Sequence, residues 1–182
     1  MELCELIKSD YIRYTGGHNH TLLNILLYLL FDRNHCFKYN FWLRLSSQKN
    51  LFQPLGIIMH RHMSRKYGIQ ISRKCKIGYG FYIGHGIGIV INPLTVIGNN
   101  VNISQFLSIG SNYGSPATIE DNVYIGPNVC IVENVHIGRG ATIGAGSVVI
   151  KDVPDNTTVA GNPARIISEK PQPFIKNPYT PK

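Results

Sequence analysis

The chain has 182 residues, of which 43% are hydrophobic and only 15% are charged, and its formal net charge is +8. This length suits one domain with a continuous core and a smaller additional region. The most apolar run, Leu22 to Phe31, is too short to span a bilayer, and no nucleic-acid-binding motif accompanies the basic residues. These features argue against an integral membrane protein and against a nucleic-acid binder.

The cysteines and the N-terminal residues favour a cytoplasmic protein. Cys4, Cys36, Cys75 and Cys130 form neither a CxxC pair nor the paired spacing of a metal site. We therefore expect reduced thiols and no metal ion. Residues 1–10 mix acidic with apolar side chains, unlike a cleavable signal peptide.

Residues 1–66 are expected to form a helical N-terminal region. Helices are predicted over 22–30, with Thr21 as N-cap, over 37–45 and over 55–66. We expect them to pack on one another, on the following domain or on a neighbouring subunit. Basic residues beside their aromatic side chains leave weak association with a membrane surface open.

Basic side chains cluster where this region ends, at Arg61, Arg65, Lys66, Arg73, Lys74 and Lys76. Without an accompanying binding motif, such a cluster is expected to be a solvated surface. His60 and His62 flank the first of these residues and are expected at the same surface.

Aliphatic side chains then recur at every sixth position. The repeated residues are Ile71, Ile77 and Ile83, then Ile91, Ile97, Ile103 and Ile109, then Ile119, Ile125, Ile131, Ile137, Ile143 and Val149. A period of six fits neither an amphipathic helix nor an alternating strand and is typical of hexapeptide coils in a parallel β-helix. The pattern predicts a mainly β chain with a β-helix over 67–152, followed by a turn and an extended, partly mobile tail over 153–182.

The six-residue step is interrupted twice, because Ile83 and Ile91 are eight residues apart and Ile109 and Ile119 are ten apart. Extra backbone cannot enter a stacked core, so each insertion must loop outward, and loops on rigid scaffolds often carry chemistry. The first insertion contains His85. The second contains residues 111–116.

Residues 68–167 resemble the hexapeptide-repeat acyltransferases, and within them the serine acetyltransferase-like branch. The matching stretches are IGHGIGIVI at 83–91, VHIGRGATIGAGSVV at 135–149 and VPDNTTVAGNPAR at 153–165. The resemblance implies a left-handed β-helix, which is an exception to the right-handed crossover rule. It also implies a homotrimer that binds acetyl-CoA between adjacent solenoids and transfers the acetyl group to a hydroxyl.

The resemblance to serine acetyltransferases is incomplete on the acceptor side. Those enzymes have a longer helical N-terminal domain, an Asp where this chain has Gln70, a second Asp at Gly84, and an Arg-His pair at 114–115. The short helical region, Gln70 and residues 90–92 are closer to the exopolysaccharide and capsule acetyltransferases of the same branch, such as the colanic-acid type.

His85 is the predicted catalytic base. Imidazole titrates near neutral pH, and the flanking Gly84 and Gly86 let a substrate approach the backbone closely. A catalytic histidine is often oriented by a carboxylate, but the corresponding segment offers Gln70. A glutamine carbonyl can accept the imidazole N–H. We therefore predict that Gln70, or a backbone carbonyl, orients His85.

The distribution of acidic residues along the sequence helps to predict which acceptor the site binds. Free serine carries an ammonium and a carboxylate, whereas residues 33–119 contain no Asp or Glu. A neutral sugar needs only uncharged partners, for which the candidates are Asn92, Gln105, Ser111, Asn112 and Tyr113. This favours acetyl transfer to a capsule or exopolysaccharide sugar. The alternatives are a serine O-acetyltransferase of cysteine biosynthesis and a non-catalytic solenoid.

Acetyl-CoA is expected along the later coils. Small residues there leave the backbone open, so that its N–H and C=O groups can bond the pantetheine amides of the cofactor. Tight coil corners also require small residues. The residues concerned are Gly126, Gly144, Ala145 and Gly146. Lys151 and Arg165 are candidates for the CoA phosphates.

Overall fold

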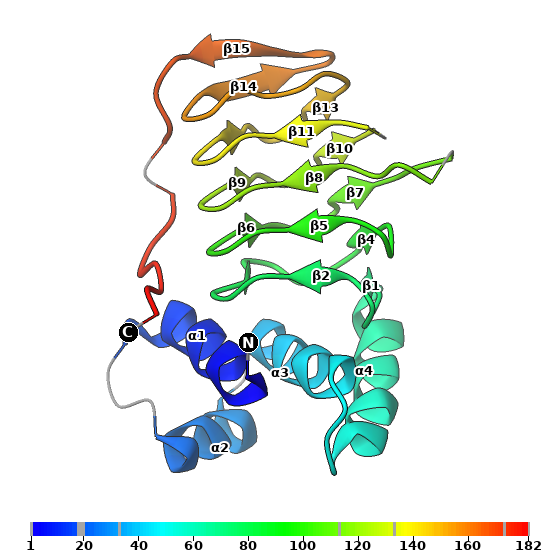
Figure 1. Ribbon diagram of the computed structural model, residues 1–182, viewed down its shortest axis with the longest axis vertical. Coiled ribbons are helices and arrows are strands. Elements are labelled where there is room, and N and C mark those ends of the chain that lie inside the picture. The colour runs from blue at the N-terminus through cyan, green and yellow to red at the C-terminus, as the bar shows by residue number, and fades with distance from the viewer. Residues whose placement is uncertain are drawn as a thin grey trace.

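The structure is a computed structural model that describes residues 2–17, 21–32, 34–112, 114–132, 134–172 and 174–181. A layer of helices lies beneath a parallel β-helix, which confirms the mainly β solenoid with N-terminal helices (Figure 1). The helices are α1 (Leu3–Thr15), α2 (Leu22–Phe31), α3 (His35–Ser47) and α4 (Gln53–Tyr67). The predicted N-cap of α2 is present, because the Thr21 hydroxyl accepts from Asn24 N–H at 3.3 Å.

Three sheets form the faces of the solenoid. Sheet A contains β1 (Gln70–Ile71), β4 (Val90–Ile91), β7 (Ser108–Ile109), β10 (Cys130–Ile131) and β13 (Val148–Val149). Sheet B contains β2 (Lys76–Ile77), β5 (Val96–Ile97), β8 (Thr118–Ile119) and β11 (His136–Ile137). Sheet C contains β3 (Tyr82–Ile83), β6 (Asn102–Ile103), β9 (Tyr124–Ile125), β12 (Thr142–Ile143), β14 (Thr158–Gly161) and β15 (Ala164–Ser168).

The stacked aliphatic residues form the core. Parallel pairing places Ile91 directly between Ile71 and Ile109, and all three side chains are at most 3% exposed. The same step continues to Val149 at the last coil. Because each coil contributes one such residue per face, the six-residue period specifies both the strand positions and their register.

The ladder continues past residue 152 and then reverses. β14 pairs in parallel with β12, and β15 turns back antiparallel on β14. The chain then descends along sheet C to α1, so that the C-terminus lies beside the first helix (Figure 1). We call residues 170–181 the C-terminal strap.

The strap is extended, as expected, but it is also bonded along its length to sheet C and the nearby corners. Gln172 N–H donates to the Thr142 hydroxyl at 3.1 Å near the top. Lower down, Asn100 and the backbone of Tyr179 exchange two hydrogen bonds, of 2.8 and 2.9 Å. The centroids of the Phe174 and Tyr124 rings lie 4.6 Å apart. The sequence could not predict these contacts, because they join positions at least 30 residues apart and depend on the path that the strap takes.

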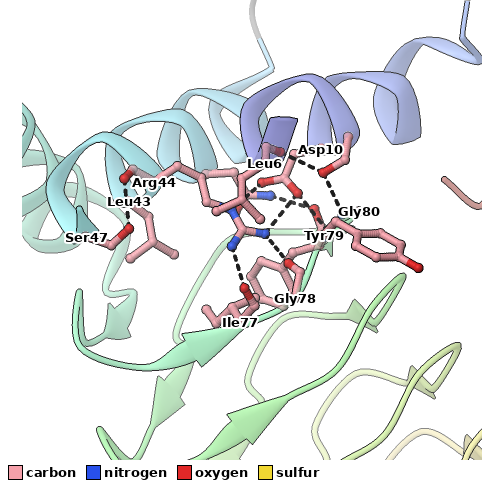
Figure 2. Close-up of polar contacts among 12 residues, drawn as sticks. Leu6, Asp10, Leu43, Arg44, Ser47, Ile77, Gly78, Tyr79 and Gly80 are labelled. Atoms are coloured by element: carbon pink, nitrogen blue, oxygen red, sulfur yellow. Dashed lines mark hydrogen bonds and ion pairs between the residues drawn. The ribbon is translucent and has the colours of Figure 1, made fainter. Parts of the chain in front are cut away.

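The helices supply hydrogen bonds to the first coil, which has no coil beneath it. Arg44 of α3 forms a bidentate ion pair with Asp10 of α1, at 2.8 and 3.0 Å (Figure 2). The same guanidinium donates to the carbonyls of Ile77 at 2.8 Å and Gly78 at 2.6 Å, while Asp10 accepts from Phe81 N–H at 2.8 Å. Burial raises the pKa of the Asp10 carboxyl, and Arg44 opposes this shift.

Within the described ranges, no helix is long and apolar enough to cross a membrane. α2 buries Ile25 and leaves most of its other large side chains exposed: Leu22, Leu23, Leu26, Leu27, Leu30 and Phe31. The surface of this helix therefore remains largely apolar.

His60 is buried, in contrast to the surface position expected for it. It is 8% exposed, and its Nε2 lies 3.0 Å from the Tyr39 hydroxyl. Burial, with a further contribution from the positive charge of Arg73, lowers the pKa of His60 from 6.5 to about 4. The unfolded chain therefore binds a proton below pH 6.5 that the folded chain excludes until about pH 4.

We expect the free energy of unfolding to fall as pH decreases through this window, with His60 responsible for up to about 3 kcal/mol of the loss. Urea unfolding between pH 7 and pH 4 measures the slope. His60→Gln should flatten it, and His62→Gln, which changes an exposed side chain, should not. Equal slopes in the wild type and His60→Gln would contradict this assignment.

Candidate active site

His85 lies on the loop that leaves β3 of sheet C and enters β4 of sheet A, and its side chain is exposed. The insertion loops outward as predicted. Its inner side is packed against α3 and against the residue before β1, because a Cβ on the buried Gly86 would lie 3.0 Å from Ile69 Cδ1 and 3.3 Å from Cys36 Sγ. A larger side chain at this position would have to displace these neighbours by a few tenths of an ångström.

Two side chains from the helices, the half-buried Tyr14 and the buried Cys36, hold the backbone on either side of His85. The Tyr14 hydroxyl of α1 accepts from Ile83 N–H at 3.0 Å and donates to Ile83 C=O at 3.1 Å. Cys36 Sγ of α3 accepts from Gly86 N–H at 3.2 Å. Burial raises the pKa of Tyr14 well above its ordinary value, so the hydroxyl keeps its proton. The helices thereby fix the loop that carries the imidazole.

A pocket of about 430 Å³ opens beside His85. Three parts of the chain form it: α1, the outer surface of sheet C with its corner, and the C-terminal strap. The lining residues are Arg13, Tyr14, Tyr82, Gly84, His85, Asn102, Ile103, Ser104, Tyr124, Phe174, Lys176 and Asn177. Residues from both ends of the chain thus meet over the histidine loop.

Arg13 joins these three parts. Its guanidinium donates to Gly80 C=O at 2.8 Å, to Lys176 C=O at 2.9 Å and to the Asn102 side chain. The side chain is 3% exposed, and burial lowers the pKa of Arg13 to about 10. It therefore remains charged at neutral pH and holds the strap against the first coils.

Gln70 is exposed on β1 of sheet A and does not line this pocket. Its backbone N–H donates to Ile89 C=O at 2.6 Å. Within the described residues of one chain, no hydrogen bond joins the Gln70 and His85 side chains. The orienting role of Gln70 therefore remains a prediction.

The residues predicted to hold the acyl donor follow strands of sheet C, as His85 does. Gly84, Gly126 and Gly144 each follow a strand of this sheet at the same corner. A Cβ on Gly126 would lie 2.9 Å from Ala145 N, whereas a Cβ on Gly146 would meet nothing within 4 Å. The first glycine is thus required by close coil stacking, and the second faces open space. Ala145 is exposed at the same corner.

The two predicted phosphate ligands lie near the end of the solenoid that is farthest from the helices. Lys151 follows β13 of sheet A, and Arg165 lies on β15 of sheet C; both are exposed. Neither lines the pocket beside His85.

Of the residues predicted to bind the acceptor, Gln105 lies nearest to the histidine loop. It follows Ser104 at the corner one coil beyond His85, and its buried Oε1 has no hydrogen-bond partner among the described residues. Ser104 itself lines the pocket, but Gln105 does not.

The other predicted acceptor residues lie at a different corner, where sheet A leads to sheet B. Asn92 Oδ1 accepts from Leu94 N–H at 2.9 Å and closes its own turn. Ser111 and Asn112 line a separate hollow of about 320 Å³ with Cys130. They belong to the loop between β7 and β8, which projects from the solenoid (Figure 1). Tyr113 lies outside the described residues.

Sequence reasoning missed most of the pocket. Tyr82, Asn102 and Tyr124 each precede a stacked isoleucine of sheet C, so the hexad register contained a signal that these side chains share one outer face. Arg13 and Lys176 gave no such signal, because they reach the pocket from the two ends of the chain. No group of three His, Cys, Asp or Glu side chains in the described ranges could hold a metal ion.

Known proteins match both the sequence and the fold. Residues 116–151 match the family described as bacterial transferase hexapeptide (six repeats). A serine acetyltransferase of Bacillus licheniformis is 42% identical over 104 residues, or 55% of this chain and 48% of that protein. Soybean serine acetyltransferase complexed with serine gives a TM-score of 0.64 at 31% identity, over 90% of this chain and 67% of that chain. A serine acetyltransferase in complex with CoA gives 0.66 at 27% identity, over 90% and 68%.

The triangular coils, the outward histidine loop and the helical layer are together the architecture of a hexapeptide-repeat transferase. The chain belongs to the hexapeptide-repeat acyltransferase family, and its relatives there are serine acetyltransferases. It spans between 32% and 48% of the length of the first curated relatives that it matches.

These relatives overturn the prediction of a capsule or exopolysaccharide sugar as the favoured acceptor, and the proposed likeness to colanic-acid-type enzymes is not supported. The proteins that match are named serine acetyltransferases, and one was solved with serine. The prediction equated the charge of the sequence around His85 with the charge of the site. Folding adds Arg13 and Lys176, so the pocket is not the uncharged one that the argument assumed.

Proposed function

We propose that the chain is a serine O-acetyltransferase that transfers the acetyl group of acetyl-CoA to the hydroxyl of L-serine. Relatives of that name are 37–42% identical to it over more than half of its length. The observation that carries the proposal is the exposed imidazole of His85 on a firmly held loop beside a pocket. This is the arrangement that general-base catalysis of acyl transfer requires.

In the proposed reaction, His85 accepts the hydroxyl proton as the serine oxygen attacks the thioester carbonyl. The carbon–sulfur bond breaks, and the proton passes to the departing thiolate, so that O-acetylserine and CoA leave. Tyr14 and Cys36 contribute by holding the backbone around His85, because a small displacement of a catalytic group is costly.

The corner that carries Gly126, Gly144, Ala145 and Gly146 is the proposed site for acetyl-CoA. Support comes from the exposed Ala145 and from the open space around Gly146, which leave room for an extended pantetheine arm beside the coils. A relative solved in complex with CoA has the same fold.

The loop that contains Ser111 and Asn112 is proposed to complete the site of a neighbouring copy. The loop projects from the solenoid at a corner different from that of His85. Ser111 and Asn112 therefore line a separate hollow and not the pocket beside His85 of their own chain. A trimer, which the family resemblance implies, would place such a loop near an adjacent chain. Sedimentation of the purified chain should therefore give three times its 20.4 kDa mass.

Thiol release from acetyl-CoA in the presence of L-serine tests the activity. We expect turnover that depends on both substrates, with glucose as the neutral hydroxyl control. Mass spectrometry should find one acetyl group on the serine oxygen. CoA release that is independent of serine, or no release at all, would refute the proposed function.

A further inference from the structure

The charge of the pocket beside His85 is one-sided. Arg13 and Lys176 line it, and no Asp or Glu is present among its lining residues. Lys176 is exposed on the strap and can direct its ammonium toward a ligand. A site with this charge attracts an anionic group and repels a cationic one.

Arg13 strengthens this asymmetry because its charge is buried without a carboxylate of its own. Its hydrogen bonds go to neutral oxygens of Gly80, Asn102 and Lys176. The acid whose charge acts on Arg13 is Asp10, which already forms the bidentate pair with Arg44. The buried guanidinium groups of Arg13 and Arg44 thus share the single carboxylate of Asp10. One positive charge is left without a partner, and it lies in the pocket wall at Arg13.

We propose that this end of the pocket is the carboxylate subsite of the acceptor, with Lys176 as the direct partner and Arg13 as the source of a fixed positive field. The inference rests on the proposed function and specifies how the acceptor is recognised. The positive charge comes from α1 and the strap, which bring Arg13 and Lys176 to the pocket from the two ends of the chain.

The ammonium of serine then receives only uncharged partners from this chain. Ser104 offers its hydroxyl in the pocket wall, and Tyr82 and Tyr124 line the same pocket. Recognition should therefore depend more on the carboxylate of the acceptor than on its ammonium. A site that paired both the carboxylate and the ammonium of serine with charged side chains would not be expected to depend mainly on the carboxylate.

Acceptor analogues test the order directly. L-Serinamide keeps the hydroxyl and the ammonium but lacks the carboxylate, whereas 3-hydroxypropanoate keeps the hydroxyl and the carboxylate but lacks the ammonium. In CoA-release assays at constant ionic strength, we expect kcat/KM for serinamide to fall at least about tenfold below that for L-serine. 3-Hydroxypropanoate should lose less than serinamide.

A substitution in the C-terminal strap tests whether Lys176 is the residue that binds the acceptor carboxylate. Lys176→Gln should lower kcat/KM for L-serine about fivefold through KM, as expected for a partly exposed ion pair. The same change should affect serinamide less than twofold, because that acceptor has no carboxylate to lose. Lys170→Gln is the matched control, since Lys170 is an exposed strap lysine that does not line the pocket. A merely structural role of Lys176 would change both acceptors alike.

The outcomes separate the two proposals. Absence of L-serine turnover refutes the function itself. Normal L-serine turnover with serinamide equally good, or with Lys176→Gln equal to the wild type, overturns the carboxylate subsite while the function stands. Selective loss of the carboxylate-bearing acceptors in Lys176→Gln supports it.

Discussion

Replacing His85 with asparagine is expected to lower kcat for acetyl transfer by about 10³-fold, which is within the range for removal of a general base. Asparagine retains a polar side chain of similar reach but cannot accept and return the proton. The loop should keep its shape, because its hydrogen bonds run through the backbone of Ile83 and Gly86 and not through the imidazole. The defect should therefore appear in kcat far more than in KM for serine.

Single-turnover and steady-state CoA release, with circular dichroism as a check on folding, measure this effect. His136→Asn is the matched control, since His136 is an exposed coil histidine on β11 of sheet B, paired with Glu120 at 3.2 Å. We expect the control to keep nearly full activity. A His85→Asn enzyme that retained wild-type kcat would remove the general base from the mechanism.

Replacing Arg44 with methionine is expected to destabilise the fold by about 3–5 kcal/mol, because it leaves the Asp10 carboxylate buried without its partner. Both side chains are at most 5% exposed, so water cannot replace the lost contacts. The substitution also removes the donors to the carbonyls of Ile77 and Gly78 at the open end of the first coil. Urea unfolding at pH 7 measures the loss.

The double variant Asp10→Asn/Arg44→Met should recover part of this loss, since the amide no longer carries an unpaired charge. Arg139→Met is the surface control. Arg139 lies 3.9 Å from Glu120 and is 62% exposed, so we expect a change of less than about 1 kcal/mol. Equal destabilisation by Arg44→Met and Arg139→Met would show that the buried pair does not hold the helices to the first coil.

The six-residue period was sufficient for the solenoid because it is a local pattern with one structural solution. Ile71, Ile91 and Ile109 could be assigned to one inner face before any tertiary contact was known, and the structure stacks them there. The two breaks in the period located both outward loops. The three predicted helices are present, and α1 was recognised only as part of the helical region, since its interior contains the polar residues that bond the first coil.

The acceptor prediction was wrong because it depended on long-range assembly. Residues 33–119 contain no acid and led to an expected uncharged site, but charge in a pocket belongs to whichever segments meet there. Lys176 and Arg13 are 163 residues apart and are joined by a hydrogen bond from the arginine to the lysine carbonyl. No local pattern predicts that contact.

The sequence by itself determined the coil, its register and the loop that carries His85, because each follows from near-neighbour spacing along a repetitive core. Only the tertiary structure decided what surrounds the imidazole: Tyr14 and Cys36 behind it, and Arg13 and Lys176 beside it. Those residues come from helices and a strap that dock through buried hydrogen bonds to the edges of the solenoid. The partners in such docking are set by three-dimensional complementarity and not by spacing along the chain.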